Sequence, residues 1–248
     1  IEMHRFSRTR MLLGSEPFQR LTDSHVAVVG LGAVGGYALE AMARTGIGRL
    51  TVVDFDTVQP TNINRQIFAL DSTIGTSKAI AAAERISDIN PACQVEPLEL
   101  FVDEESVEDI FSRQPDIVID AIDSLNPKAQ LLRSCYQRGF PVFSSMGAAL
   151  RTDPLAVRVG DLSESNHCPL AKRIRKRLRK DQIVSGITCV YSIERVDFDY
   201  TQEFDPVQVE TGTDRGRPRN TLGSLPTITA IFGLVLANEV IKKLSGIP

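Results

Sequence analysis

Apolar and polar residues follow two alternating patterns along the first 147 residues, one typical of buried strands and one of amphipathic helices. Short apolar runs predict five strands, at 25–30, 49–55, 94–100, 116–122 and 141–145. Longer stretches with helical spacing predict four helices between them, at 33–45, 78–90, 103–113 and 127–138. Strands that alternate with helices of this length are typical of βαβ units. We therefore predict a Rossmann-like α/β fold, a mostly parallel sheet flanked by helices.

The pattern changes after Gly147. Two short strands, a basic helix, a loop rich in Gly, Pro and Thr, and a closing apolar helix are predicted there, at 156–159, 188–197, 169–180, 201–222 and 227–244. We expect the two strands to be antiparallel and to extend the same sheet. The chain is then a single adenylating domain, with a nucleotide-binding core at 1–147 and a substrate-facing elaboration at 148–248.

Composition narrows the class of protein further. The chain is 42% hydrophobic and 24% charged, as in ordinary globular proteins, and its net charge of −3 excludes a general basic field for nucleic acid. No C-x-x-C pair occurs among the four cysteines, Cys93, Cys135, Cys168 and Cys189. We therefore expect neither a zinc site of the usual kind nor a disulfide framework, and we place the protein in a reducing cytoplasm.

The longest apolar stretch, Pro226 to Ile241, raises the question of a membrane. It contains Asn238 and Glu239 and is shorter than the ~20 residues that a spanning helix needs. The first ten residues are mixed and charged, so we expect no signal peptide. We predict a packed helix, with weak membrane association as the alternative.

A glycine loop lies between the first predicted strand and helix. Gly30, Gly32 and Gly35 form G-x-G-x-x-G, which lets backbone N–H groups approach a phosphate at the start of a helix. Asp54 ends the second predicted strand, 24 residues after Gly30, where a carboxylate can bind ribose hydroxyls. These residues alone would predict a dinucleotide-dependent oxidoreductase.

The polar residues beyond Asp54 favour a triphosphate instead. Arg65 and Lys78 can neutralise phosphates, and Asn62 can donate a hydrogen bond to them. Asp123 ends the fourth predicted strand and would face the same crevice, where a carboxylate suits Mg²⁺ between phosphates. We therefore predict ATP and Mg²⁺ as ligands. No Walker A pattern occurs, which excludes a P-loop kinase.

The stretch from Asp54 onward resembles the signature of the ubiquitin-activating-enzyme superfamily, the group that includes the ThiF, MoeB and HesA proteins. The matching positions are Asp54, Asp56, Val58, Thr61, Asn62, Arg65 and Gln66. Lys78 and the D-A-I-D at 120–123 match in spacing, with Ser124 where Asn is usual. The resemblance implies that these residues and the glycine loop bind ATP. It also implies that a substrate carboxylate attacks the α-phosphate, which gives an acyl adenylate and pyrophosphate.

The N-terminal Arg5-Phe-Ser-Arg8 resembles a further element of that superfamily. In relatives its second arginine reaches the ATP of the neighbouring subunit, so the resemblance implies a homodimer in which Arg8 acts in trans. The resemblance also allows a monovalent cation and a sulfur-transfer or carrier protein. A catalytically silent scaffold is disfavoured, because such a protein need not keep Arg65, Lys78 and Asp123.

Residues 169–180 carry seven positive charges within nine positions: Lys172, Arg173, Arg175, Lys176, Arg177, Arg179 and Lys180. Leu170, Ile174 and Leu178 recur every four residues, which predicts a helix that packs by one apolar stripe and exposes its bases. Such a block in an acidic chain is typical of a surface that binds the RNA backbone. Arg215, Arg217 and Arg219 would extend it. The alternatives are a merely solvated helix and an anionic membrane.

The lack of zinc pairs and the segment 188–192 resemble one branch of the superfamily. Its members dehydrate threonylcarbamoyladenosine in tRNA: the threonyl carboxylate is adenylated, and the carbamoyl group closes onto it and releases AMP. The alternative is an adenylyltransferase for the C-terminus of a ubiquitin-like sulfur carrier. Cys189 resembles a cysteine of the branch and is a candidate for a transient thioester, although packing is the commoner role. Cys168 replaces an Asp before the basic helix, which leaves the helix cap open.

Overall fold

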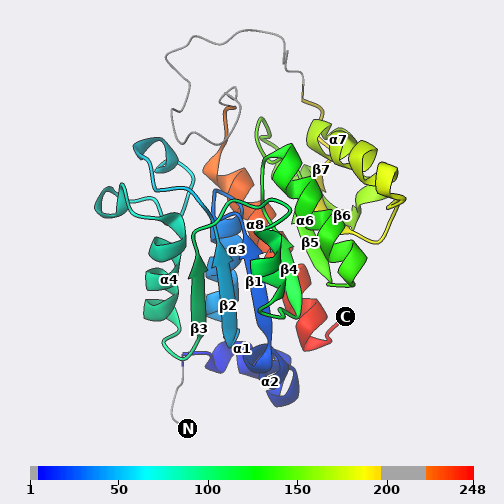
Figure 1. Cartoon of the computed structure of the whole chain (residues 1–248). Helices are drawn as coiled ribbons and strands as arrows, with labels where there is room; N and C mark the ends of the chain where they lie inside the picture. Colours follow the sequence, from blue (N-terminus) through cyan, green and yellow to red (C-terminus); the bar gives the residue numbers. More distant parts are fainter. Residues whose placement is uncertain (1–4, 197–221) are drawn as a thin grey trace.

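A seven-stranded sheet forms the centre of the computed structural model, which describes residues 5–196 and 222–248 (Figure 1). The strand order is β3-β2-β1-β4-β5-β7-β6. The strands are β1 (His25–Val29), β2 (Arg49–Val53), β3 (Gln94–Leu98), β4 (Ile117–Asp120), β5 (Val142–Ser145), β6 (Val157–Asp161) and β7 (Thr188–Ser192). Each neighbouring pair from β3 to β7 is parallel, which confirms the predicted Rossmann-like sheet.

The two strands of the second half extend this same sheet. β6 is antiparallel to β7, as predicted, with Val159 opposite Val190. β7 itself runs parallel to β5, with Cys189 beside Ser144, so the antiparallel part of the extension is the β6–β7 pair.

Helices cover both faces of the sheet. They are α1 (Ser7–Leu13), α2 (Ser15–Asp23), α3 (Gly35–Thr45), α4 (Lys78–Ile89), α5 (Val107–Phe111), α6 (Leu125–Arg138), α7 (Pro169–Leu178) and α8 (Pro226–Ser245). Short 3-10 turns join them, at η1 (Pro60–Asn62), η2 (Asp71–Thr73), η3 (Pro154–Ala156), η4 (Leu162–Glu164) and η5 (Arg179–Asp181). The predicted helix 103–113 is shorter because the Asp103 carboxylate accepts the N–H groups of Glu105 and Ser106 and holds a turn there.

The apolar core forms two clusters, one on each face. Val26 and Val28 of β1 belong to the cluster under α3, α4 and α8, whereas Ala27 and Val29 belong to the cluster under α5, α6 and α7. The closing helix α8 packs directly on α3: a Cβ at Gly233 would lie 2.3 Å from the carbonyl oxygen of Val34. Its expected role as a packed helix is confirmed. Among the described residues, no helix is long and apolar enough to span a membrane.

The two N-terminal helices, which periodicity did not predict, lie at the amino ends of the strands. The N–H of Arg49, at the start of β2, donates to the carbonyl of Ser24, which follows α2. Arg5 donates to the carbonyl of Ile89, at the end of α4. The loops that follow β1, β2 and β4 lie at the opposite, upper edge of the sheet (Figure 1). That edge carries the predicted nucleotide residues.

Candidate nucleotide site

The glycine loop after β1 is held by contacts that leave no room for a side chain at Gly30 or Gly35. Gly30 has φ +89°, and its N–H donates to the carbonyl of Val53 at 2.8 Å. A Cβ at Gly30 would lie 2.9 Å from the carbonyl carbon of Ala121, and one at Gly35 only 1.7 Å from the carbonyl oxygen of Gly30. Gly32 differs, because the nearest atom to its Cβ position is Nε2 of Gln66 at 3.8 Å. The loop therefore packs by Gly30 and Gly35 and has space at Gly32.

Asp54 joins this loop to the end of β2. Its buried carboxylate accepts the N–H of Leu31 at 2.7 Å through Oδ2 and the N–H of Asp56 at 2.9 Å through Oδ1. Burial raises the pKa of the Asp54 carboxyl, and nearby Lys78 and the two N–H donors oppose that rise. The predicted ribose carboxylate is therefore rigidly placed beside the glycine loop.

The expected phosphate-binding lysine lies in the same region. Lys78 begins α4 and is buried, and its Nζ lies 3.0 Å from Oδ2 of Asp56. The N–H of Lys78 also donates to the carbonyl of Asp56 at 3.0 Å. A buried ammonium at the start of a helix and next to a glycine loop is a suitable partner for a polyphosphate.

The segment from Gln59 to Gln66 folds over this region through η1. Asn62 is buried, and its Oδ1 accepts the N–H of Gln59 at 3.1 Å. Gln66 is also buried, and its amide nitrogen is the neighbour of Gly32 noted above. Arg65 is only half-buried, and it donates to the carbonyl of Thr61 at 2.9 Å and to Oδ1 of Asn64 at 2.8 Å. All three predicted residues of this segment thus lie on one short turn.

Asp123 follows β4 and is exposed. It comes directly after Ala121 and Ile122, the backbone against which Gly30 packs. Among the described residues, no group of three or more His, Cys, Asp or Glu side chains could hold a metal ion alone. Mg²⁺ bound with nucleotide phosphates needs only one or two protein carboxylates, with phosphate oxygens and water completing its shell. The single carboxylate of Asp123 therefore fits Mg²⁺ bound to ATP.

Arg8 does not join these residues within one chain. It is exposed on α1, at the amino edge of the sheet, whereas the glycine loop lies at the carboxyl edge (Figure 1). Two apolar side chains of the same helix are also exposed, Met11 at 82% and Leu12 at 84%. Large exposed apolar side chains that lie together are typical of surfaces that contact another protein.

The basic helix α7 packs as predicted. Ile174 and Leu178 are fully buried, and Ala171 joins them on the same face. Cys168 is the N-cap of α7, because its sulfur accepts the N–H of Ala171 at 3.5 Å. The cysteine therefore caps the helix as the usual Asp would. Six basic residues of α7 and η5 are exposed: Lys172, Arg173, Lys176, Arg177, Arg179 and Lys180.

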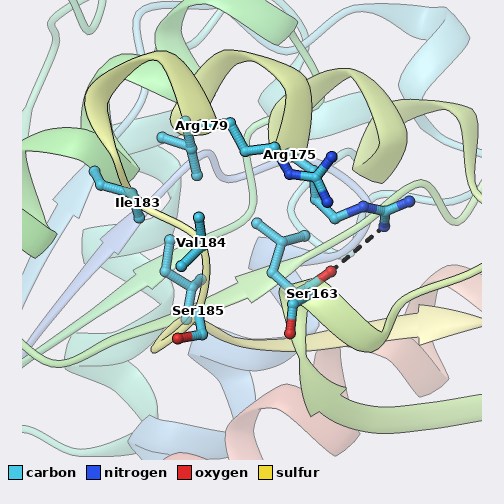
Figure 2. Close-up of a pocket in the computed structure, with 9 residues that line it drawn as sticks. Ser163, Arg175, Arg179, Ile183, Val184 and Ser185 are labelled. Carbon is cyan, nitrogen blue, oxygen red and sulfur yellow. Dashed lines mark hydrogen bonds between the residues drawn. The ribbon is translucent and has the colours of Figure 1, made fainter.

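Arg175 differs from its neighbours. It is half-buried, and its Nη1 donates to the carbonyl of Ser165 at 2.7 Å and to that of Leu162 at 3.4 Å. Figure 2 shows Arg175 and Arg179 above a small hollow that is also lined by Ser163, Val184 and Ser185. This hollow lies at the β6 edge, outside the nucleotide site. The predicted loop arginines 215, 217 and 219 lie outside the described residues.

Cys189 lies on β7, the strand next to the β6 edge of the sheet. It is fully buried on β7, between Ser144 of β5 and Gly160 of β6. Burial raises the pKa of its thiol to about 12, so the sulfur stays protonated at neutral pH. Because a nucleophilic cysteine acts as a thiolate, this environment favours the packing role over a thioester.

Sequence reasoning missed one charged pair beneath the site. Lys128 on α6 and Asp120 at the end of β4 are both fully buried, with Nζ 2.7 Å from Oδ2. The sequence did contain a signal for this pair, because Lys128 lies on the apolar face of the predicted helix 127–138. A charged residue is buried on such a face almost only when it is paired.

Comparison with known proteins defines the class that this fold and site belong to. The family model described as "ThiF family" matches residues 6–248, and the chain belongs to that family. It is 39% identical over 245 residues to the tRNA threonylcarbamoyladenosine dehydratase of Bacillus subtilis (strain 168). The matched region covers 98% of this chain and 95% of the relative.

A solved structure and a second relative place the chain within the family. The crystal structure of E. coli tRNA N6-threonylcarbamoyladenosine dehydratase in complex with ATP matches with a TM-score of 0.85 and 37% identity, over 98% of this chain and 94% of that one. The molybdopterin-synthase adenylyltransferase of Salmonella typhimurium is 34% identical over only 154 residues, 61% of each chain. The similarity to the tRNA-modifying enzymes therefore includes the β6–α7–β7 half, whereas the similarity to the carrier-activating enzyme does not extend over the whole chain.

Proposed function

We propose that this protein is an ATP-dependent enzyme that dehydrates threonylcarbamoyladenosine in tRNA to a cyclic form. The observation that carries the proposal is the glycine loop tied to Asp54 and flanked by Lys78, in a chain similar over nearly its full length to enzymes of that name. The crystal structure of the E. coli enzyme contains ATP.

The reaction consists of two displacements. The threonyl carboxylate of the substrate attacks the α-phosphorus of ATP, and pyrophosphate leaves. The carbamoyl group of the same side chain then attacks the acyl carbonyl and releases a proton, and AMP leaves with one carboxylate oxygen. Relative to the neutral acid, the product has lost one water. Because the second nucleophile is tethered to the first, no carrier protein is needed.

The chain's own residues would bind and orient ATP for these steps. The N–H groups around Gly32 approach the phosphates, and Asp54 accepts from the ribose hydroxyls. Cationic and amide side chains hold the polyphosphate: Asn62, Arg65, Gln66 and Lys78. Mg²⁺, held by Asp123 and phosphate oxygens, would neutralise charge on the leaving pyrophosphate. Asp56 positions Lys78 through the 3.0 Å contact.

The tRNA substrate has a suitable surface on α7 and η5. The six exposed basic side chains there support backbone binding, whereas Arg175 donates within its own chain and is left out of the proposed contact. A tRNA substrate supports a reaction in the cytoplasm. A monovalent cation, a sulfur-transfer partner and a membrane contact have no role in this proposal.

Arg8 would complete the site of a second copy. Within one chain it lies at the opposite edge of the sheet from the glycine loop, so only another subunit can bring an Arg8 to that loop. The exposed Met11 and Leu12 on the same helix support a homodimer that covers α1.

The decisive experiment is incubation with ATP, Mg²⁺ and tRNA from cells that lack this activity, followed by mass spectrometry of the nucleosides. The expected result is loss of one water from threonylcarbamoyladenosine, dependent on ATP and accompanied by AMP. A Lys78→Ala variant serves as the matched negative control. No mass change with the intact protein, together with pyrophosphate exchange on a sulfur-carrier protein, would overturn the proposal.

A further inference from the structure

A fully buried ion pair lies directly beneath the nucleotide site. Nζ of Lys128 lies 2.7 Å from Oδ2 of Asp120, and both side chains are 0% exposed. Removing two charges from water costs several kcal/mol per ion, and apolar residues of similar volume often serve a core equally well. The contacts of this pair therefore need an account beyond packing.

The pair hydrogen-bonds both backbone groups of Ile122, its N–H and its carbonyl. Oδ1 of Asp120 accepts the N–H of Ile122 at 3.1 Å, and Nζ of Lys128 donates to the carbonyl of Ile122 at 2.9 Å. Oδ2 of Asp120 also accepts from Oγ of Ser144 on β5, at 2.6 Å. The backbone at Ile122 is thus clamped by two charged side chains that are themselves anchored in the sheet and in α6.

Ile122 lies between the two parts of the nucleotide site. On one side it touches the glycine loop: a Cβ at Gly30 would be 3.1 Å from the nitrogen of Ile122. On the other side it is bonded to Asp123. The position of the Ile122 carbonyl therefore fixes where the Asp123 backbone starts in relation to the loop.

We propose that Lys128 is a positioning residue for the nucleotide site: its ammonium holds the Ile122 carbonyl and so keeps the Asp123 carboxylate in register with the glycine loop. Lys128 touches neither ATP nor metal in this scheme and acts through Ile122 alone. The proposal rests on the proposed function, since Asp123 is the residue assigned to Mg²⁺.

The test needs a variant that removes the ammonium without leaving a buried lone charge. Lys128→Met alone would leave the Asp120 carboxylate unpaired, which is strongly destabilising. The double variant Asp120→Asn/Lys128→Met is neutral, keeps an oxygen for the Ile122 N–H and removes the donor to its carbonyl. The control is Arg133→Met/Asp181→Asn, which removes a second, less buried ion pair of α6, with Nε of Arg133 2.8 Å from Oδ2 of Asp181.

The measurement is ATP affinity by calorimetry, with Mg²⁺ and with EDTA, beside hydrogen exchange of the peptide that contains 121–124. Mg²⁺ should raise the ATP affinity of the unmodified protein over its value in EDTA. In the double variant we expect this ratio to be smaller by about tenfold or more, because residues that orient metal ligands have effects of that size. Exchange at 121–124 should rise, while the control matches the unmodified protein in both readouts. Asp120→Asn/Lys128→Gln, which offers the Ile122 carbonyl a neutral donor, should recover part of the gain.

The role of Lys128 would be overturned if the folded Asp120→Asn/Lys128→Met variant kept both the Mg²⁺-dependent increase in ATP affinity and slow hydrogen exchange at 121–124. A lower melting temperature would not change that conclusion. If the unmodified protein binds ATP equally well with Mg²⁺ and with EDTA, the magnesium role of Asp123 fails first and this inference fails with it.

Discussion

Asp54 accepts the backbone N–H of Leu31 through Oδ2 at 2.7 Å, which ties the carboxylate after β2 to the loop after β1. The other oxygen accepts the N–H of Asp56, so both oxygens are already used as acceptors on the protein side. The carboxylate thus sets the shape of the glycine loop while its remaining lone pairs can accept from ribose hydroxyls.

Asp54→Asn should therefore weaken nucleotide binding. An amide has one acceptor oxygen and no charge, so it loses the charge-assisted hydrogen bond to the ribose, worth about 1.5–3 kcal/mol, or roughly tenfold to a hundredfold in Kd. Calorimetric titration with ATP and with AMP measures this. Asp71→Asn, an exposed carboxylate on η2, is the control and should bind like the unmodified protein. Equal affinity in the two variants would contradict the assignment.

Alanine at Gly35 should affect mainly folding stability, whereas alanine at Gly32 should affect mainly ATP binding. The Cβ at Gly35 would overlap the Gly30 carbonyl at 1.7 Å, so Gly35→Ala should destabilise the fold by about 3 kcal/mol or more. Gly32→Ala has space, with its nearest neighbour at 3.8 Å, and should change stability by less than about 1 kcal/mol. It should nevertheless weaken ATP binding, because the methyl group occupies the phosphate side of the loop. Thermal melts and titrations separate the two effects, and normal ATP binding by Gly32→Ala would argue against this geometry.

Arg8→Ala and Asp123→Ala should each be inactive yet folded. If Arg8 acts in trans, a purified heterodimer of the two variants has one complete site and should recover about half of the wild-type rate. Co-expression with two different tags gives this species, and turnover of modified tRNA measures it. A heterodimer as inactive as both parents would show that Arg8 does not serve the partner's site.

Replacing the six exposed bases of α7 and η5 by Gln should weaken tRNA binding and flatten its salt dependence. Each lost phosphate contact should reduce the slope of log K against log salt by about 0.7–0.9. Lys242→Gln/Lys243→Gln, on the last turn of α8, provides the control, because α8 packs on the other face of the sheet from α7. An unchanged slope in the α7 variant would mean that the helix is merely solvated.

Cys189→Ala should keep turnover within about twofold, since a buried thiol with a pKa of about 12 supplies no thiolate at neutral pH. The lost sulfur should cost about 1 kcal/mol of stability, because it packs in the apolar cluster between the sheet and the helices α6 and α7. Nucleoside mass spectrometry and a thermal melt measure the two quantities. A hundredfold loss of turnover in a folded variant, with a substrate thioester trapped on the unmodified protein, would restore the nucleophilic role.

Local patterns in the chain were sufficient for the parallel sheet, the glycine loop and the apolar stripe of α7. Strand runs, helix spacing and turn glycines act between residues close in sequence, so their physics is visible without coordinates. Gly30 and Gly35 illustrate this, because the tight turn that they form is local. Asn62, Arg65 and Gln66 also lie on one turn, because the N–H groups of Arg65 and Gln66 both donate to the carbonyl of Asn62. Their contact with phosphate stays a prediction.

Only the tertiary structure decided which distant residues meet. The chain order of Asp120, Lys128 and Ser144 does not reveal a buried network, because β4, α6 and β5 must first pack to bring the three together. Packing also directs the Arg175 side chain to the backbone carbonyl of Ser165 and makes β7 parallel to β5. A sequence states each residue's charge and apolarity, but burial and pairing depend on contacts across the fold, and these decide whether a charge binds a ligand or supports the site.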